Sequence, residues 1–116
     1  MLADARMWNG KPDRRLDLFG GKGEVRVWSL LRTAMPPFDC ALGCELDAGG
    51  SVGVHVQEKC SEIIICIEGT GEACVDDEVT TLGPGVVVAL PLGRTLALSN
   101  TSSTHPLRYM IVKAVV

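Results

Sequence analysis

The sequence GGSVGVHVQEKCSEIIICIEG, from Gly49 to Gly69, decides the fold. From Val52 to Gln57 the valines alternate with glycine, histidine and glutamine, and a period of two is typical of a strand with one packed face. A polar turn over residues 58–61 and a β-branched run over residues 62–67 follow. We therefore expect two antiparallel strands, and a hairpin between them brings Glu62 back beside the face that carries His55 and Gln57.

His55, Gln57 and Glu62 are the candidate metal ligands of this stretch. An imidazole, an amide oxygen and a carboxylate that converge suit a borderline or hard divalent ion. The alternative is a hydrogen-bonded network of the same three side chains that lines a metal-free pocket, because buried polar groups need partners. Cys60 lies in the turn before Glu62, from where its thiol would reach a metal at the rim of the site.

Length and composition limit the classes of protein to which the chain can belong. Its 116 residues are enough for one domain, here residues 1–116, that buries a core without disulfide or metal staples. A net charge of −3 and only two tryptophans, one tyrosine and two phenylalanines argue against nucleic acid as a partner. The N-terminus lacks the apolar core of a signal peptide, and no apolar run approaches the ~20 residues of a spanning helix. We expect a soluble, cytoplasmic protein with no membrane partner.

The five cysteines predict thiols rather than a disulfide framework. Their number is odd and they form no C-x-x-C pair. Cys40, Cys44, Cys66 and Cys74 lie inside strand patterns, where cysteine behaves as a small apolar residue, and a reducing cytosol keeps it a thiol.

Outside the opening stretch, the chain reads as a series of short strands. Residues 1–23 are irregular, with a short strand at 16–19, because Pro12 and three glycines prevent a long helix. Residues 24–31 form a strand whose inward set is either Val25 and Val27 or Trp28 and Leu30. Further strands are expected at 38–46, 72–76, 78–82, 86–90, 95–99 and 107–112. About ten strands with frequent turns favour an antiparallel sandwich or barrel over residues 24–116. Because exposed strand edges must be closed or paired, we also expect a homodimer.

The residues that recur at fixed spacing resemble two motifs of the cupin superfamily. The first, G-x5-H-x-H-x4-E-x6-G, is matched by Gly49, His55, Glu62 and Gly69, with Gln57 in place of the second histidine. The second, G-x5-P-x-G-x2-H-x3-N, is matched by Gly85, Pro91, Gly93 and Asn100, with Leu96 where the histidine belongs. The resemblance implies an all-β fold, the antiparallel double-stranded β-helix or jelly-roll barrel of a small single-domain cupin of the cupin 2 conserved-barrel type.

The same resemblance implies a degenerate metal site. In metal-binding relatives, three histidines and one glutamate hold a divalent ion inside the barrel. This chain keeps His55 and Glu62, offers Gln57 as a weaker ligand and has no donor at Leu96. A divalent ion such as Mn, Fe, Ni or Zn would then bind weakly, with water completing its shell.

Two classes of function follow. One is a small-molecule-binding module with a degenerate central site, and the alternative is a metal-dependent enzyme of the oxygenase, isomerase, lyase or cyclase type, in which His55 and Glu62 act as ligands or as general base and acid. Four further residues are candidates for contacts with a ligand or a partner. Arg94 either meets an anionic ligand or is an ordinary exposed arginine, His105 is expected in a solvated loop, and Trp8 and Trp28 line a pocket or fill core or dimer contacts.

Overall fold

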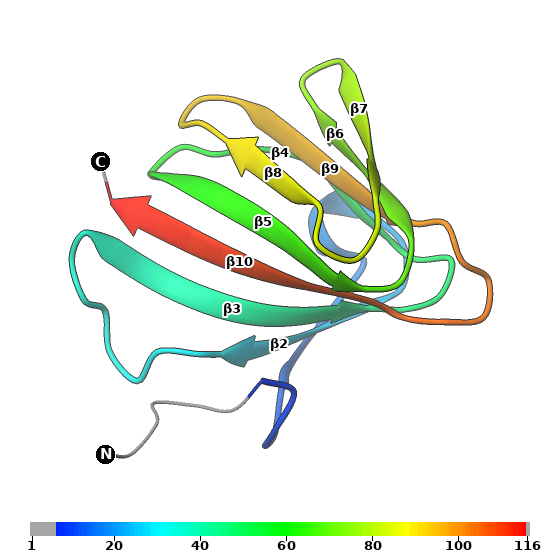
Figure 1. Ribbon diagram of the computed structural model, residues 1–116, viewed down its shortest axis with the longest axis horizontal. Coiled ribbons are helices and arrows are strands. Elements are labelled where there is room, and N and C mark those ends of the chain that lie inside the picture. Colours follow the sequence, from blue (N-terminus) through cyan, green and yellow to red (C-terminus); the bar gives the residue numbers. More distant parts are fainter. Residues whose placement is uncertain (1–6, 116) are drawn as a thin grey trace.

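The computed structural model describes residues 7–115 as two packed antiparallel sheets (Figure 1). The larger sheet has the order β1-β2-β3-β10-β5-β8 and the smaller one the order β4-β9-β6-β7. The strands are β1 Asp13–Leu16, β2 Glu24–Ser29, β3 Phe38–Leu46, β4 Ser51–Val56, β5 Cys60–Glu68, β6 Gly71–Val75, β7 Glu78–Leu82, β8 Val87–Leu90, β9 Thr95–Asn100 and β10 Leu107–Val115. The predicted all-β antiparallel fold is confirmed. Within residues 7–115, no helix is long and apolar enough to cross a membrane.

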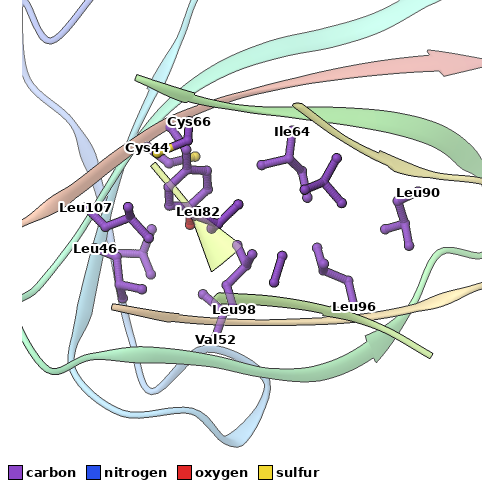
Figure 2. Close-up of a cluster of buried hydrophobic side chains, with 14 of the residues drawn as sticks. Cys44, Leu46, Val52, Ile64, Cys66, Leu82, Leu90, Leu96, Leu98 and Leu107 are labelled. Atoms are coloured by element: carbon purple, nitrogen blue, oxygen red, sulfur yellow. The ribbon is translucent and has the colours of Figure 1, made fainter. Parts of the chain in front are cut away.

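The core lies between the inner faces of the two sheets. Tyr109 of β10 is the cross-strand partner of Cys44 on one side and of Cys66 on the other, and all three are buried. Figure 2 shows Leu96 and Leu98 pointing from the smaller sheet toward Ile64 and Cys66 of the larger one. In β2 the inward residues are Val25 and Val27, which decides the register that the sequence left open.

The expected hairpin within residues 52–67 is wrong. β4 pairs with β9, whereas β5 pairs with β10 and β8, so the two strands belong to different sheets. The short connection between Val56 and Cys60 carries the chain from one sheet to the other. Residues at the end of β4 and the start of β5 therefore face each other across the interior instead of lying side by side on one surface.

A β-bulge in β4 also changes which residues point inward. Val52 pairs with Leu98 and His55 pairs with Leu96, so two residues of β4, Gly53 and Val54, lie opposite the single residue 97 of β9. Val52 is buried, but Val54 and Val56 are exposed. The alternating valines therefore do not mark one packed face, as the sequence pattern suggested, although His55 and Gln57 still point the same way.

The N-terminal segment packs onto β4. The strand expected at residues 16–19 is wrong, because β1 ends at Leu16 and a 3-10 turn, η1, follows at Leu18–Gly20. Asp17 and Phe19 have positive φ angles of 49° and 54°. Gly21 and Gly53 allow the close approach, since a Cβ on Gly53 would run into the carbonyl oxygen of Phe19. Residues 1–6 of the predicted irregular segment lie outside the described residues.

The remaining motif residues have structural roles. Gly49, Gly69, Gly85 and Gly93 all have positive φ, and at Gly69 a Cβ would also meet the Pro106 carbonyl oxygen. The Asn100 side chain is buried, and its Nδ2 donates to the carbonyl oxygens of Leu46, Asp47 and His105. These residues hold turns in place, so their match to the motifs is evidence for the fold and not for a particular reaction.

Candidate functional site

A cavity of about 180 Å³ lies between the two sheets, and we call it the chamber. Its walls are mostly apolar and come from both sheets and from the N-terminal segment. They are formed by Arg15, Leu18, Phe19, Val25, Val27, Leu42, Cys44, Val52, His55, Val56, Gln57, Glu62, Leu96, Leu98, Tyr109, Ile111 and Lys113.

Glu62 and Gln57 form a buried polar bridge across this interior. The Gln57 amide Nε2 donates to Glu62 Oε1, and the two side chains are only 7 % and 3 % exposed, respectively. The Gln57 backbone is fixed by two hydrogen bonds to the turn after β8, through Gly93 N and Arg94 O. The second carboxylate oxygen of Glu62, Oε2, is buried and has no hydrogen-bond partner among the described residues.

The orientation of the His55 ring is set by two contacts. Its Nδ1 lies 3.0 Å from the carbonyl oxygen of Gly53, and because a carbonyl only accepts, Nδ1 carries the proton. In the neutral ring, Nε2 then keeps a lone pair. Phe19 stacks on the imidazole with ring centroids 4.0 Å apart and an interplanar angle of 13°. The strained η1 turn thus covers His55 with an aromatic ring.

Lys113 adds a cation to the same inner face. It is the cross-strand partner of Glu62 in the β5–β10 ladder and of Cys40 in the β3–β10 ladder. Directly opposite residues share one face of a sheet. Lys113 nevertheless forms no salt bridge with Glu62 or with any other residue in the described range 7–115.

The chamber opens into a wider recess of about 800 Å³, which we call the mouth. The residues shared by the chamber and the mouth mark the neck between them. They are Phe19, His55, Val56, Gln57 and Lys113. The Phe19–His55 stack and the Lys113 side chain therefore lie at the boundary between the two cavities.

Cys44 and Tyr109 line the chamber but not the mouth. Burial, together with the nearby Glu62 carboxylate, raises the pKa of the Cys44 thiol to about 12, although a hydrogen bond with Tyr109 acts in the opposite direction. Burial also raises the pKa of Tyr109 well above its usual value. Both groups are therefore neutral at physiological pH, and this wall offers a hydroxyl and a thiol rather than charges.

The positions that the motifs assign to metal ligands do converge, but they do not supply four donors. His55, Gln57, Glu62 and Leu96 all line the chamber, and Leu96 is directly opposite His55. Leucine has no donor atom, and the Gln57 amide nitrogen is engaged with Glu62. In residues 7–115 no three His, Cys, Asp or Glu side chains gather into a group that could hold a metal. This donor set does not fit a tightly held ion, and weak binding through His55, Gln57 and Glu62 stays a prediction.

The other candidate residues lie outside the chamber. Arg94 is exposed and forms an ion pair of 2.7 Å with Asp76, and His105 lies in an exposed loop with its Nδ1 2.8 Å from Thr104 Oγ1. Cys60 is buried and lines the mouth. All five cysteines are free. Trp8 and Trp28 pack edge to face against each other and line neither the chamber nor the mouth.

Three residues of the site were missed from the sequence. Lys113 and Tyr109 point inward from β10, as Leu107 and Ile111 do. Alternate residues of a strand share one face, so the i, i+2 spacing from Leu107 could have predicted both. Phe19 lies in a turn in which Asp17 and Phe19 have a left-handed backbone conformation. The local sequence has no recognisable pattern for such a turn.

Comparison with known proteins gives a consistent picture. The profile of the family described as the cupin domain matches residues 44–113. A predicted oxalate decarboxylase from Thermotoga maritima is 27% identical, with a TM-score of 0.89 over 100% of both chains. A cupin 2 conserved barrel domain protein from Salinispora arenicola is also 27% identical, with a TM-score of 0.63 over 76% of this chain and 74% of that one.

The polyketide cyclase RemF from Streptomyces resistomycificus shares the fold at 18% identity, with a TM-score of 0.77 over 98% of this chain and 80% of that one. No curated protein sequence matches the chain.

Proposed function

The chain belongs to the cupin family, and we propose that it binds a small organic molecule in the chamber. The observation that carries the proposal is Glu62 Oε2, a buried acceptor without a partner in residues 7–115. An unsatisfied buried polar group costs about 1–3 kcal/mol. A ligand that donates a hydrogen bond from a hydroxyl or an amine to this oxygen would remove that cost.

The size and walls of the chamber define the ligand's carbon skeleton. A dry protein cavity of ~150 Å³ accepts one benzene molecule, and the chamber measures about 180 Å³. The skeleton is therefore one ring, or a chain of similar volume, with a short substituent. Leu96, Leu98 and Ile111 provide apolar contacts for it.

The charge at the neck defines the ligand's second polar group. Lys113 has no salt-bridge partner within residues 7–115 and lies directly opposite Glu62, with the two Cβ atoms about 5 Å apart in such a pair. A ligand carboxylate at Lys113 and a hydroxyl or amine at Glu62 Oε2 would satisfy both groups at once. The ligand class is thus a compact hydroxy or amino acid. The Thermotoga maritima relative is named for oxalate, another small carboxylate.

We expect mandelate to bind more tightly than two analogues that each lack one polar group. Phenylacetate lacks the hydroxyl and 1-phenylethane-1,2-diol lacks the carboxylate, and the loss of a charge-assisted hydrogen bond should weaken binding about tenfold or more in each case. Isothermal titration calorimetry in EDTA measures the three dissociation constants. Equal constants would contradict the proposed ligand class.

Two variants locate the binding. Glu62→Gln and Lys113→Met should each remove the preference for mandelate, because the first puts an amide donor in place of a carboxylate oxygen and the second removes the cation directly opposite position 62. Lys22→Met is the matched control, since Lys22 is exposed and lines none of the described pockets. A preference that survives both site variants would show that mandelate binds elsewhere.

Catalysis in the same chamber is a second candidate function, and the orientation of His55 favours it. With Nδ1 donating to Gly53, the Nε2 lone pair makes the neutral ring a suitable general base. Proton NMR of mandelate incubated overnight with equimolar protein, in EDTA and then with Mn, Fe, Ni or Zn, tests for turnover. Metal analysis of the wild type, His55→Ala and Glu62→Ala distinguishes metal-dependent from metal-free catalysis. Stoichiometric metal in the wild type that is lost in both variants would establish a metal-dependent site.

A further inference from the structure

Arg15 is a cation in the chamber wall that has no role in the function proposed above. In the β1–β2 ladder it lies directly opposite Val25, which is buried and lines the chamber, so both side chains belong to the inner face of the larger sheet. Its neighbour Arg14 lies opposite Arg26 on the outer face and forms an ion pair of 3.1 Å with Glu24. Of these two adjacent arginines, the chamber is lined by Arg15 alone.

Arg15 and Lys113 belong to opposite ends of this inner face. The row of cross-strand partners that begins at Arg15 reaches β10 at Leu107, whereas Lys113 lies six residues further along that strand. At ~3.4 Å per residue, the two rows are about 20 Å apart. Figure 2 shows Leu107 at the left of the core and Leu90, the cross-strand partner of Glu62, at the right. Arg15 therefore approaches the chamber from the end farther from Lys113.

A hydrogen bond draws the guanidinium group of Arg15 from its own row toward the middle of the chamber. Arg15 Nε donates to Asp13 Oδ2 at 3.0 Å. Asp13 lies opposite Val27, and Val27 lies opposite Cys44, so this carboxylate belongs to the row of Cys44. Burial raises the pKa of the Cys44 thiol to about 12, and the positive charges of Arg15 and Lys113 act in the opposite direction. The wall at Cys44 is thus within the field of both cations.

The two Nη groups of Arg15 are available to a ligand. Within residues 7–115 the side chain bonds to Asp13 alone, and that bond uses Nε. A guanidinium group presents paired N–H donors that match the two oxygens of a carboxylate. The Arg15 and Asp13 side chains are 50% and 63% exposed, and an ion pair this exposed contributes little. A ligand carboxylate at Arg15 would also keep part of its hydration, which lowers the cost of bringing it there.

We propose that Arg15 is a specificity-determining residue that binds a second anionic group of the ligand. With one carboxylate at Lys113 and the hydroxyl or amine at Glu62 Oε2, as in the proposed function on which this assignment rests, the second carboxylate lies at Arg15. The carbon skeleton between them contacts the apolar wall at Val27 and Leu98. The preferred ligand is therefore a compact hydroxy or amino dicarboxylic acid whose two carboxylates lie at opposite ends.

Arg14 provides a matched control, because an arginine on β1 also has an ordinary structural explanation. β1 is the edge strand of the larger sheet, and charged side chains on an edge discourage pairing with other chains. Arg14 satisfies that requirement as well as Arg15 does, yet it lines none of the described pockets. A binding effect that is specific to Arg15 therefore separates ligand recognition from the general charge of the strand.

Isothermal titration calorimetry in EDTA with three ligands tests this role. The ligands are mandelate, para-methylmandelate and para-carboxymandelate, of which the last two carry a neutral or an anionic group at the far end of the ring. We expect the wild type to bind para-carboxymandelate about tenfold or more tightly than para-methylmandelate, because Arg15 adds charge-assisted hydrogen bonds. Arg15→Gln should bring this ratio close to one and leave the affinity for mandelate nearly unchanged.

Two further variants refine the comparison. Arg15→Lys should keep part of the ratio, since it retains the charge but not the paired donors. Arg14→Gln should keep all of it. Circular dichroism verifies that each variant is folded, and if Arg15→Gln does not fold, Arg15→Lys gives the same comparison with a smaller expected change.

The titrations distinguish failure of this role from failure of the proposed function. If mandelate binds but the wild-type ratio is near one, or the ratio survives Arg15→Gln, or Arg14→Gln lowers it equally, Arg15 does not read the ligand, and the proposed function stands. If none of the three ligands binds, the proposed function and the role of Arg15 are both overturned.

Discussion

In Glu62, Oε1 accepts a hydrogen bond from Gln57, and Oε2 is buried without a partner among the described residues. Nothing in the packing of the barrel requires this pair, because apolar side chains such as Leu96 and Leu98 fill the neighbouring inward positions. Binding sites commonly retain polar groups that reduce the stability of the protein. We interpret the Gln57–Glu62 pair as one of them.

Replacing both members of this pair should stabilise the protein and abolish binding. Gln57→Leu with Glu62→Leu removes the unsatisfied oxygen and its amide partner together, and we expect the free energy of unfolding to rise by about 1–2 kcal/mol. Urea denaturation measures this change, and calorimetry with mandelate measures the loss of binding. Glu62→Leu alone should raise the free energy of unfolding by less, because it leaves the buried Gln57 amide without its acceptor. A double variant less stable than the wild type would show that the pair stabilises the fold.

At the scale of secondary-structure elements, the η1 turn and β4 depend on each other. Phe19 covers His55 because two glycines let the backbones of these segments approach closely. Gly53→Ala should therefore push η1 away from β4, lower the free energy of unfolding by more than about 2 kcal/mol and expose His55. Gly83→Ala is the control, since a Cβ there meets nothing within 4 Å and its φ is not in the left-handed region.

Urea denaturation measures the stability of the two alanine variants. Hydrogen exchange of the amides in residues 17–21 reports whether the turn has separated from the strand, since local opening accelerates exchange. If the amides of Gly53→Ala and Gly83→Ala exchange alike, the close approach is not what holds the turn.

At the scale of the whole molecule, the two sheets bring together residues that the chain keeps far apart. His55, Gln57 and Leu96 come from the smaller sheet and its extension, and Glu62 comes from the larger one. Restoring histidines with Gln57→His and Leu96→His should create a four-donor site and raise the affinity for Zn or Ni about 100-fold or more. Titration with a competing chelator measures the affinity, and Leu98→His with Gln57→His is the control. Equal affinities in both double variants would show that position 96 does not complete the site.

The predictions from the sequence succeeded where fixed spacing reported local geometry. Gly69 has the positive φ and Asn100 makes the side-chain hydrogen bonds of a turn, and His55, Gln57 and Glu62 line one cavity. The pairing of strands was not predictable, because a short connection between two strands leads equally well to a hairpin or to the opposite sheet. The β4 bulge and the Phe19 turn were missed because they depend on contacts between segments rather than on local preference.

The family profile begins at residue 44, yet part of the chamber wall lies before that point. Arg15, Leu18, Phe19, Val25, Val27 and Leu42 all line the cavity from this earlier part of the chain. His55, Gln57 and Glu62 inside the chamber and the Phe19 cover over it thus come from separate parts of the chain. A change of specificity is open to the protein through residues 15–42 alone, so residues 13–21 are the natural target for a library that changes which ligands enter the barrel and leaves His55, Gln57 and Glu62 intact.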